Sequence, residues 1–537
     1  MSRRAFYLTT PIYYVNDRPH IGHVYTTTVA DILARHRRLH GDDVFFLTGV
    51  DEHAAKVVEA AAARGLTTRE WADSNAAAFR DTFARLGITN TDFVRTSDPR
   101  HTTRVQACLA ALRATGDVYE GQYEGWYDSG QEEYVVDSKA EEYGFVSPVN
   151  GRPLVRKTEK NYFFRLSAYR EPLLRLLEGG QSIDGHAFIV EPEARRNEIA
   201  ARVREMEDVP ISRTGQGGWG IPFPGDETQT VYVWIDALFN YLTYVDDDDR
   251  RRYWASGVTH LIAKDILWFH AAIWPALLLA LRRCAGFEWV RLPARVYAHS
   301  FWIADGQKMS KSLGNFIDID RIDRYVEGFG LDALRWFLAT RGPLGTYDSD
   351  FSESKFIEAY NTDLANAIGN CTSRVVKMTA SYFDGVLPAP QQGIGAGSAH
   401  ARAAADAAAV YVSAMARIDL AAAGDAAMDL VRGVDGYIAE TAPFTLAKDP
   451  ARRPDVGTIL YNCAETLRIA AVLLWPFAPS RMTELWRRLG WAHDNDALQG
   501  NGTAVFSAWT AWGGLQPGTR LTIGDPLFPR HQADSPS

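Results

Sequence analysis

The stretch Phe6-Tyr7-Leu8-Thr9 is an apolar run near the N-terminus, and a helical stretch from about Gly22 to His40 and the run Val44-Phe45-Phe46-Leu47 follow it. A strand, a helix and a second strand in this order are typical of parallel α/β folds. Helical periodicity resumes at residues 54–64 and again at residues 68–86. The first hundred residues therefore predict strands and helices that alternate around a parallel sheet.

An insertion interrupts this pattern. From about Thr115 to Gly220 the sequence consists of short aromatic runs separated by turn residues, which indicates an inserted domain. Strand-like runs then return, so the sheet begun at the N-terminus is expected to resume after the insertion. These later runs are Thr230–Trp234, His260–Ala263 and Val296–Ile303.

The C-terminal part has a different composition. After about Ser352, Ala, Leu and Arg recur at helical spacing, and a connection rich in Pro and Gly from Leu387 to Gly397 interrupts them. This pattern predicts a C-terminal bundle of helices.

Length and composition narrow the class of protein. A chain of 537 residues and 59.8 kDa is expected to form two to four domains, which excludes a peptide hormone or a minimal binding module. Hydrophobic residues make up 46% and charged residues 23%, as in soluble globular proteins, so wholesale disorder is excluded. The net charge of -9 gives no overall attraction for polyanions, and any nucleic-acid contact must use local basic clusters.

Cysteine usage and apolar runs predict a cytoplasmic protein. The four cysteines lie far apart and form no C-x-x-C pair, which argues against a zinc knuckle or a disulfide framework. The apolar run that follows Arg4 is too short for a signal peptide. The longest apolar stretch, from Ala271 to Leu281, contains Pro275 and is too short to span a bilayer, so no membrane association is expected.

The first chemical motif is His20-Ile21-Gly22-His23, between the first strand and the first helix. A helix N-terminus offers unpaired N–H groups and a positive dipole end, to which His20 and His23 can add donors for phosphate oxygens. Gly22 leaves room for a flat base near the backbone. Two histidines at a helix start also occur for structural reasons, so this motif alone does not identify a phosphate-binding site.

The second motif is Lys308-Met309-Ser310-Lys311-Ser312, which follows Asp305-Gly306-Gln307 and precedes Leu313-Gly314-Asn315. Two ammonium groups in such a loop can stabilise the charge that develops as a nucleophile attacks the α-phosphorus of a nucleoside triphosphate. Alone, the lysine pair would also fit an exposed basic turn. Because the five-residue string occurs downstream of the histidine motif, it is highly specific for the triphosphate-binding role rather than for an exposed turn.

With both motifs, the chain resembles the class I aminoacyl-tRNA synthetases, and among them the methionyl-tRNA synthetase family. The resemblance extends from Phe6 to about Gly490. It implies a Rossmann-type parallel-sheet catalytic domain split by an inserted connective domain, followed by an all-α anticodon-binding bundle. The matching blocks are Thr9–Asn16, Phe45–His53, Asn161–Leu166, Tyr232–Ala237 and Lys264–His270. The implied domains are 1–114, 115–220, 221–350 (with the lysine loop) and 351–537.

The resemblance also implies a reaction. The carboxylate of L-methionine would attack ATP to form methionyl-adenylate and pyrophosphate, and initiator and elongator tRNA(Met) would then accept the methionyl group on the terminal ribose 2′-hydroxyl. The enzyme would supply orientation and charge stabilisation rather than a nucleophile. Mg²⁺ would accompany ATP, held mainly by phosphates and water. The residues expected to be catalytic are His20, His23, Lys308 and Lys311, and Gly22, Ser310 and Ser312 join them in binding ATP.

Further positions of the family map to two binding surfaces. Asp51 and the backbone near Ile12 match the groups that hold the amino acid's ammonium, and an aromatic pocket suits a polarizable thioether. On residue spacing alone, Trp234 and Trp274 would be core aromatics. Asn370 and Arg374, one helical turn apart, match anticodon-facing positions, and Phe444 stands where the family normally has Trp. The positions that match the side-chain pocket are Tyr14, Trp234, Tyr241, Ile266, His270 and Trp274.

The chain departs from the family in three places. Asp128 and Gly130 stand where a zinc-binding C-x-x-C begins in many relatives, so no structural zinc is expected. Ala263 replaces a usual Gly in the loop facing ATP, so an altered nucleotide contact is expected there. The chain leaves no room for the dimerisation domain that some relatives append, so a monomer is expected.

The alternatives are a different synthetase of the same class and a non-catalytic RNA-binding protein that keeps the fold. The Ile, Val and Leu enzymes carry a much larger editing insertion, and the Cys enzyme uses a zinc-cysteine site that this sequence lacks. A non-catalytic RNA-binding paralogue would have no chemical need for His20, His23, Lys308 and Lys311. The sequence does not distinguish a cell's main enzyme from an accessory copy.

Overall fold

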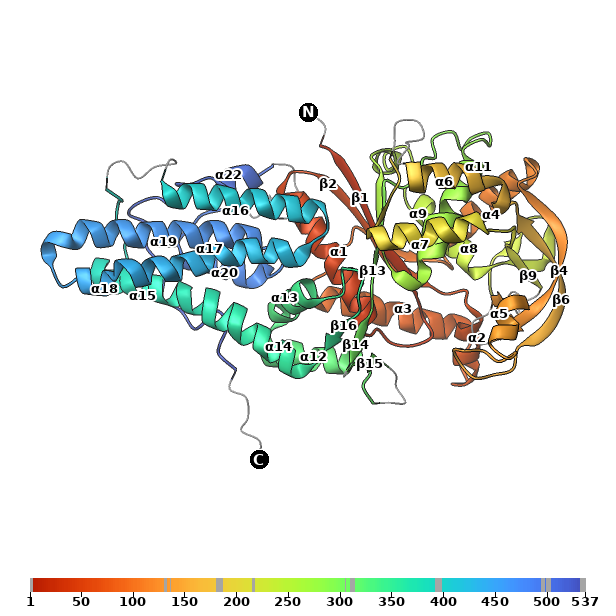
Figure 1. Ribbon diagram of the computed structural model, residues 1–537, viewed down its shortest axis with the longest axis horizontal. Coiled ribbons are helices and arrows are strands. Elements are labelled where there is room, and N and C mark those ends of the chain that lie inside the picture. Colours follow the sequence, from red (N-terminus) through yellow and green to blue (C-terminus); the bar gives the residue numbers. More distant parts are fainter. Residues whose placement is uncertain are drawn as a thin grey trace.

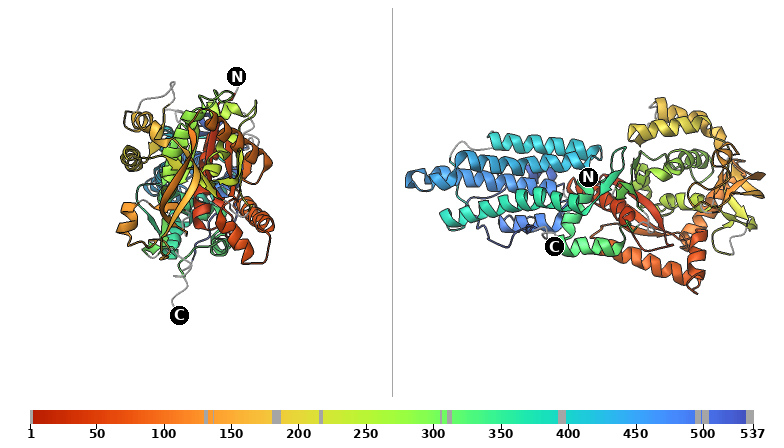
Figure 2. Two further views of the ribbon diagram at one scale, coloured as in Figure 1. Left: turned by 90° about the vertical axis from the view of Figure 1, so that its right-hand side faces the viewer. Right: turned by 60° about the horizontal axis from the view of Figure 1, so that its bottom comes forward.

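The protein is elongated, with the sheet-containing part on the right of Figure 1 and a long bundle of helices on the left. The computed structural model describes residues 3–129, 133–135, 137–179, 187–214, 218–304, 306–309, 314–391, 398–493, 498 and 504–531. The bundle and the sheet-containing part also lie side by side in the right-hand view of Figure 2.

A six-stranded parallel sheet organises the right-hand part, as the sequence predicted. Its order is β3-β2-β1-β12-β13-β7. The inner strand β2 is buried from its second residue to its last, which explains its unbroken apolar run. The strands are β1 (Ala5–Tyr14), β2 (Asp43–Asp51), β3 (Asp92–Arg95), β12 (Val258–Ala263), β13 (Arg295–His299) and β7 (Ile189–Glu191).

Helices connect these strands as the periodicity predicted. The first connection is α1 (Ile21–Leu39), and the second contains α2 (Ala55–Ala62) and α3 (Thr68–Arg85). Thr67 caps α3: its side chain accepts from the backbone N–H of Glu70, whose carboxylate accepts in turn from the Thr67 N–H. After β3, α4 (Pro99–Ala114) leads into the inserted segment.

Two segments differ from the sequence-based expectation. The run Thr230–Trp234 was expected to be a strand of the main sheet, but Trp234 lies in the short helix α8 (Val233–Leu238). Val233 and Asp236 are buried three residues apart, as are Ile235 and Leu238, and a short apolar run alone cannot separate helix from strand. In addition, β7 lies within the range expected for the insertion yet pairs with β13 of the central sheet.

The inserted segment, together with residues 222–231 just beyond its expected end, forms two small antiparallel sheets. One has the order β5-β4-β6-β8, in which the long strands β4 (Val118–Asp128) and β6 (Val155–Phe164) pair over most of their length. Its outer strands are β5 (Glu133–Val135) and β8 (Val209–Pro210). The other sheet contains β9 (Ser212–Thr214), β10 (Pro222–Phe223) and β11 (Asp226–Val231).

Helices fill the C-terminal half, as predicted, and α19 forms the centre of the bundle. Residues 450–474 are long and apolar enough to cross a membrane, but the most apolar 18 residues of this helix lie wholly inside the protein, and every residue from Val456 to Leu474 is buried. It is therefore a core helix. The bundle contains α14 (Glu353–Ala359), the π-helix Tyr360–Gly369, α15 (Asn370–Phe383), α16 (Ala399–Ala416), α17 (Leu420–Thr441), α18 (Pro443–Leu446), α19 (Arg453–Leu474) and α20 (Pro479–Arg488).

A buried ion pair holds the C-terminal segment on the bundle. Glu465 and Arg468 of α19 are fully buried and pair at 2.7 Å. Arg468 donates to the carbonyl oxygens of Trp509 and Ala511, and the Glu465 carboxylate accepts from three backbone N–H groups. Those N–H groups belong to Gly513, Gly514 and Leu515, at 2.8 to 2.9 Å.

The two halves of the molecule meet along α1. Asp31 of α1 accepts from Arg35 and from Arg335 of α13 (Leu331–Arg341), both at 2.7 Å. Arg335 also donates to the carbonyl oxygens of Pro476 and Phe477, which follow α19. The end of α1 meets the last helix, α22 (Phe506–Thr510): the Val505 N–H donates to the Leu39 carbonyl at 3.0 Å, and Phe506 stacks on His40.

Candidate active site

The histidine motif caps α1 at the carboxyl end of β1. His20 is the N-cap residue, and its Nδ1 accepts from the Gly22 N–H at 3.1 Å. The Nδ1 of His23 accepts from the His20 N–H at 3.3 Å. Because each Nδ1 is an acceptor, the proton of each neutral ring lies on Nε2, where it can be donated to a ligand. A Cβ at Gly22 would lie 3.0 Å from the His20 ring, so a side chain there would crowd the motif.

Aromatic rings fix the orientation of His23. Its ring lies 3.7 Å from that of His20, 4.6 Å from that of Tyr13 and 5.1 Å from that of Phe79, measured between centroids. Burial, together with the neighbouring His20, holds the pKa of His23 well below its ordinary value. His23 is therefore neutral at physiological pH and contributes a hydrogen-bond donor rather than a positive charge.

The segment after the lysine loop packs against the histidine motif. His20 forms an isolated antiparallel bridge with Asp318, and the Ile21 N–H donates to the Ile317 carbonyl at 3.0 Å. The ring of Phe316 lies 5.2 Å from that of His20. These contacts hold residues 316–318, which follow the lysine loop, against a motif nearly three hundred residues earlier in the sequence.

Lys308 projects from a third small sheet, with the order β15-β14-β16. Its backbone pairs with Ile303, and the Asn315 side chain donates to its carbonyl at 3.4 Å. Lys308 interacts electrostatically with Asp265. Ser310, Lys311 and Ser312 lie outside the described residues. The strands are β14 (Trp302–Ala304), β15 (Gln307–Lys308) and β16 (Ser349–Phe351).

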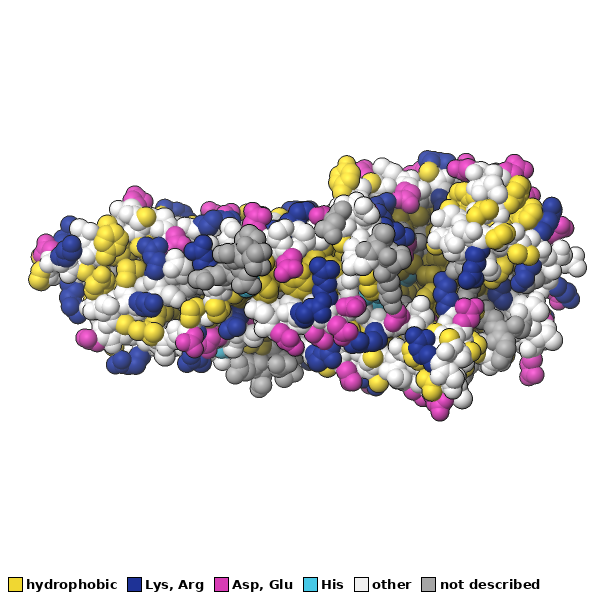
Figure 3. Space-filling model, turned by 90° about the horizontal axis from the view of Figure 1, so that it is seen from below, with side chains coloured by type: hydrophobic (Ala, Val, Ile, Leu, Met, Phe, Trp, Pro, Cys, Tyr) yellow, Lys and Arg dark blue, Asp and Glu magenta, His cyan; other side chains and the backbone are white. Residues whose placement is uncertain are grey.

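The residues expected to bind the amino acid form a front and a back layer. Ile12, Tyr14, Trp234 and Ile266 are partly exposed, whereas Tyr241, His270 and Trp274 are buried. Viewed from the side on which β14 and β15 lie, the molecule is hollowed, and apolar and histidine side chains are visible in the hollow (Figure 3).

Ring contacts join the front layer. The ring centroid of Trp234 lies 5.8 Å from that of Tyr14 and 4.6 Å from that of Phe269, on which it stacks. Asp51, the last residue of β2, is opposite Tyr14 in the sheet register and accepts from the His53 N–H at 3.3 Å. Tyr14 thus has both a residue with a buried carboxylate and an indole ring as neighbours.

Hydrogen bonds fix the back layer in a neutral state. Nδ1 of His270 lies 3.0 Å from the Ile266 carbonyl and so carries the proton, which leaves Nε2 to accept from the Tyr241 hydroxyl at 2.7 Å. Burial lowers the pKa of His270 to about 4. Trp274 donates from Nε1 to Nε2 of His260 at 3.3 Å. The pocket therefore has a polarizable, uncharged wall that suits an apolar side chain.

The buried histidines predict that the folded protein is less stable at acidic pH. Burial lowers the pKa of both His270 and His299 from 6.5 to about 4, so between these values the unfolded chain binds protons that the folded protein does not. The free energy of unfolding is expected to fall as the pH decreases from 6.5 to 4, by about 1.4 kcal/mol per pH unit for each group. Urea unfolding at pH 7, 6 and 5 measures this slope. His299→Asn should flatten it, and an unchanged slope would contradict the assignment.

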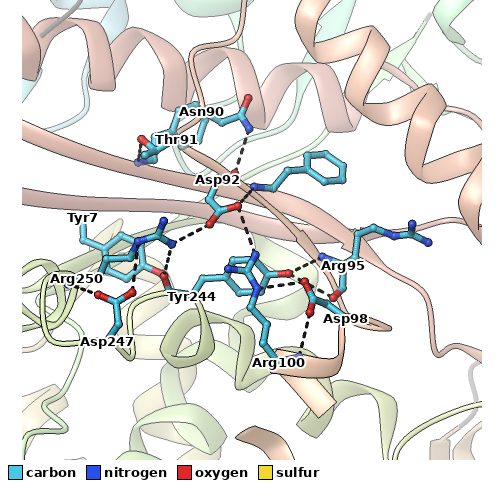
Figure 4. Close-up of polar contacts among 12 residues, drawn as sticks. Tyr7, Asn90, Thr91, Asp92, Arg95, Asp98, Arg100, Tyr244, Asp247 and Arg250 are labelled. Carbon is cyan, nitrogen blue, oxygen red and sulfur yellow. Dashed lines mark hydrogen bonds and ion pairs between the residues drawn. The ribbon is translucent and has the colours of Figure 1, made fainter. Parts of the chain in front are cut away.

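A polar network attaches the helix that carries Tyr241 to the sheet (Figure 4). Tyr7 of β1 donates from its hydroxyl to the Tyr241 carbonyl at 2.9 Å, in α9 (Asn240–Thr243). The Tyr244 hydroxyl accepts from the Arg95 N–H at 2.9 Å, and Arg250 bridges Asp92 and the Tyr244 carbonyl. This network could not be predicted from the sequence, because its members come from three distant segments.

The anticodon candidates lie on the bundle. Asn370 is exposed on α15, and Arg374, one turn later, pairs with Asp435 of α17 at 2.7 Å. Phe444 stands on α18 and is 52% exposed, which leaves its ring free to stack. Within the described contacts, no hydrogen bond or ring contact joins Phe444 to Asn370 or Arg374.

The described residues contain no group of three or more His, Cys, Asp or Glu side chains placed to hold a metal ion. Asp128 stands where the zinc-binding C-x-x-C begins in many relatives. It is buried and accepts from the Asn150 side chain at 3.3 Å.

Comparison with known proteins gives consistent matches over nearly the whole chain. The family model described as tRNA synthetases class I (M) matches residues 6–144 and 143–376. The methionine-tRNA ligase of Mesorhizobium japonicum is 40% identical over 539 residues, which cover 99% of this chain and 98% of that protein. That of Streptomyces coelicolor is 39% identical and covers 98% and 97%. A structure of Mycobacterium tuberculosis methionyl-tRNA synthetase in complex with methionyl-adenylate superposes with a TM-score of 0.85 at 34% identity, covering 98% of this chain and 99% of that one.

Proposed function

The chain belongs to the class I aminoacyl-tRNA synthetases, in the methionyl-tRNA synthetase family, and from this membership we infer that it is an ATP-dependent methionine-tRNA ligase. It activates L-methionine as methionyl-adenylate and then transfers the methionyl group to tRNA(Met), both initiator and elongator. The observation that supports this proposal is the packing of residues 316–318, which follow the lysine segment, against His20 of the histidine motif.

In the first step, a carboxylate oxygen of methionine bonds to the α-phosphorus of ATP while the bond to the bridging oxygen breaks and pyrophosphate leaves. The Nε2–H groups of His20 and His23 donate to the phosphate oxygens, and Gly22 leaves space for the nucleotide. Lys308 and Lys311, with Ser310 and Ser312, neutralise the charge that develops on the leaving pyrophosphate. In the second step, the terminal ribose hydroxyl of tRNA attacks the activated carbonyl and AMP leaves.

Methionine occupies the pocket between the two layers. Asp51 and the backbone near Ile12 hold its ammonium group. The thioether lies among aromatic rings whose fixed positions reject the branched side chains of Ile and Val. The walls of this pocket are Tyr14, Trp234, Tyr241, Ile266, His270 and Trp274.

Mg²⁺ accompanies ATP and withdraws electron density from its phosphates when bound. Phosphate oxygens and water would supply most of its ligands. We propose further that the chain needs no structural zinc, acts as a monomer in the cytoplasm, and divides into domains 1–114, 115–220, 221–350 and 351–537.

The bundle recognises the anticodon through Asn370, Arg374 and Phe444. Arg374→Ala is expected to lower kcat/KM for charging tRNA with a CAU anticodon by about 10- to 100-fold, because one charged hydrogen bond contributes about 1.5–3 kcal/mol. Adenylate formation should be unchanged. Arg432→Ala, which removes an exposed arginine paired with Asp429 on α17, is the control and should leave charging unchanged. If Arg374→Ala also abolished adenylate formation, the bundle would be supporting the active site rather than reading the anticodon.

The function is tested by amino-acid-dependent exchange of labelled pyrophosphate into ATP, with each of the twenty amino acids and without tRNA. Exchange with methionine alone is the expected result. Exchange with another amino acid would retain the class but overturn the pocket assignment. No exchange with any amino acid, even after tRNA is added, would favour a non-catalytic RNA-binding protein.

A further inference from the structure

A buried carboxylate between two histidines lies behind the proposed methionine pocket. Asp236 of α8 is fully buried, and its two oxygens accept separately from Nδ1 of His53 and Nε2 of His101, both at 2.6 Å. His53 follows β2, and His101 lies in α4. These three residues, which we call the Asp236 clamp, have no part in the reaction described above.

The clamp connects the two sides of the pocket. On one side, the His53 N–H donates to the carboxylate of Asp51, which is proposed to hold the substrate ammonium. On the other side, Trp234 lies two residues before Asp236 on the same short helix and packs against Tyr14. The position of Asp236 therefore sets the distance between the carboxylate and the indole wall.

The second histidine extends the clamp to the back layer. Nδ1 of His101 lies 3.1 Å from the hydroxyl of Thr243, in the helix α9 that carries Tyr241. The helices α8 and α9 contain 6 and 4 residues and have no side-chain cap, so their own hydrogen bonds cannot hold them in place. Tertiary contacts must do so, and the clamp supplies two short ones.

The carboxylate of Asp236 is ionised within the clamp, which strengthens its hydrogen bonds. Burial alone would raise the pKa of Asp236, but the charges and hydrogen bonds of His53 and His101 outweigh burial and lower it. The carboxylate is thus ionised, and hydrogen bonds to an ionised acceptor are shorter and stronger than neutral ones. Trp219 adds a further support, because its Nε1 donates to the Glu52 carbonyl at 2.6 Å and its ring meets that of His53.

We propose that Asp236 is a positioning residue for amino-acid binding: through His53 and His101 it holds Asp51, Trp234 and Tyr241 in the arrangement that binds methionine, without touching the substrate. This inference rests on the proposed function. It predicts a selective effect, since the histidine motif and Lys308 belong to other elements and do not depend on the clamp.

The test is Asp236→Asn, assayed by pyrophosphate exchange. Asparagine keeps the volume but offers one acceptor oxygen and one NH₂ donor, so one histidine loses its partner. The KM for methionine is expected to rise at least tenfold, whereas the KM for ATP should change less than twofold. Asp363→Asn is the matched control, because Asp363 is a buried carboxylate that accepts from Trp336 and Arg341 away from the pocket. It should leave both KM values unchanged.

A second pair of variants covers the case in which Asp236→Asn fails to fold. His53→Asn places an amide donor where Nδ1–H stood and should keep the methionine KM near that of the wild type, whereas His53→Leu should raise it as Asp236→Asn does. Equal increases in the two KM values, or an unchanged methionine KM in His53→Leu, would overturn the positioning role. If the wild-type protein shows no methionine-dependent exchange, the proposed function itself fails, which is a separate outcome.

Discussion

His20→Asn is expected to slow adenylate formation by on the order of 100- to 1000-fold while leaving the protein folded. Asparagine is a favourable N-cap residue and can still accept from the Gly22 N–H. It has no donor in the place of the Nε2–H, which is the group that we propose donates to the phosphate in the transition state. Loss of one such preorganised donor costs about 2.7–4 kcal/mol of transition-state stabilisation. Single-turnover formation of methionyl-adenylate measures the rate.

A second N-cap provides the control for this variant. Ser398 caps α16 by accepting from the Ala401 N–H at 3.1 Å, in the bundle. Ser398→Asn makes a comparable change at a helix start and should leave the rate unchanged. Thermal unfolding should show both variants within about 0.5 kcal/mol of the wild type, because one capping residue replaces another. A wild-type rate in His20→Asn would remove His20 from the catalytic set.

Glu465→Ala is expected to lower the free energy of unfolding by about 3–5 kcal/mol, since removal of one partner leaves the charge of Arg468 buried and uncompensated. Three backbone N–H groups of residues 513–515 lose their acceptor as well. The segment that follows Phe506 should therefore detach from the bundle before the rest of the protein unfolds. Urea unfolding measures the loss, and hydrogen exchange at residues 513–515 locates it.

The control for Glu465→Ala is an ion pair of similar spacing at the surface. Asp429 and Arg432 pair at 2.6 Å but are 71% and 49% exposed, and such pairs contribute less than about 1 kcal/mol. Asp429→Ala should therefore change the free energy of unfolding little. Equal losses in the two variants would mean that burial does not determine the strength of the Glu465–Arg468 pair.

The sequence predicted the features that depend on local pattern. The apolar run of β2 and the periodicity of α1 identified the start of the parallel sheet, and the Ala-rich C-terminal half identified the bundle. The histidine and lysine motifs were recognisable because several chemically unusual residues stand together. The position of the histidine motif at the end of the central sheet follows from topology, since β1 and its neighbours are parallel and their carboxyl ends share one edge.

Features that depend on pairing over long distances were missed. The Asp236 clamp joins residues separated by 183 and 135 positions, and a single histidine or aspartate in the sequence carries no sign of its partner. Trp234 was placed in a strand because a short apolar run fits either structure until its packing is known. The strand β7 was also missed. It has only three residues, and its pairing with the central sheet, rather than its own sequence, stabilises it.

The contact between Leu39 and Val505 has a consequence for how the protein is made. A ribosome adds about 5–20 residues per second, so the end of α1 waits on the order of tens of seconds for the residues that cover it. A delay about half as long affects β1, whose neighbour β12 is synthesised about halfway through the chain. During this time, the unpaired edge of β1 and the uncovered face of α1 are accessible to other nascent chains. The yield of folded protein therefore depends on how quickly translation reaches the last helix.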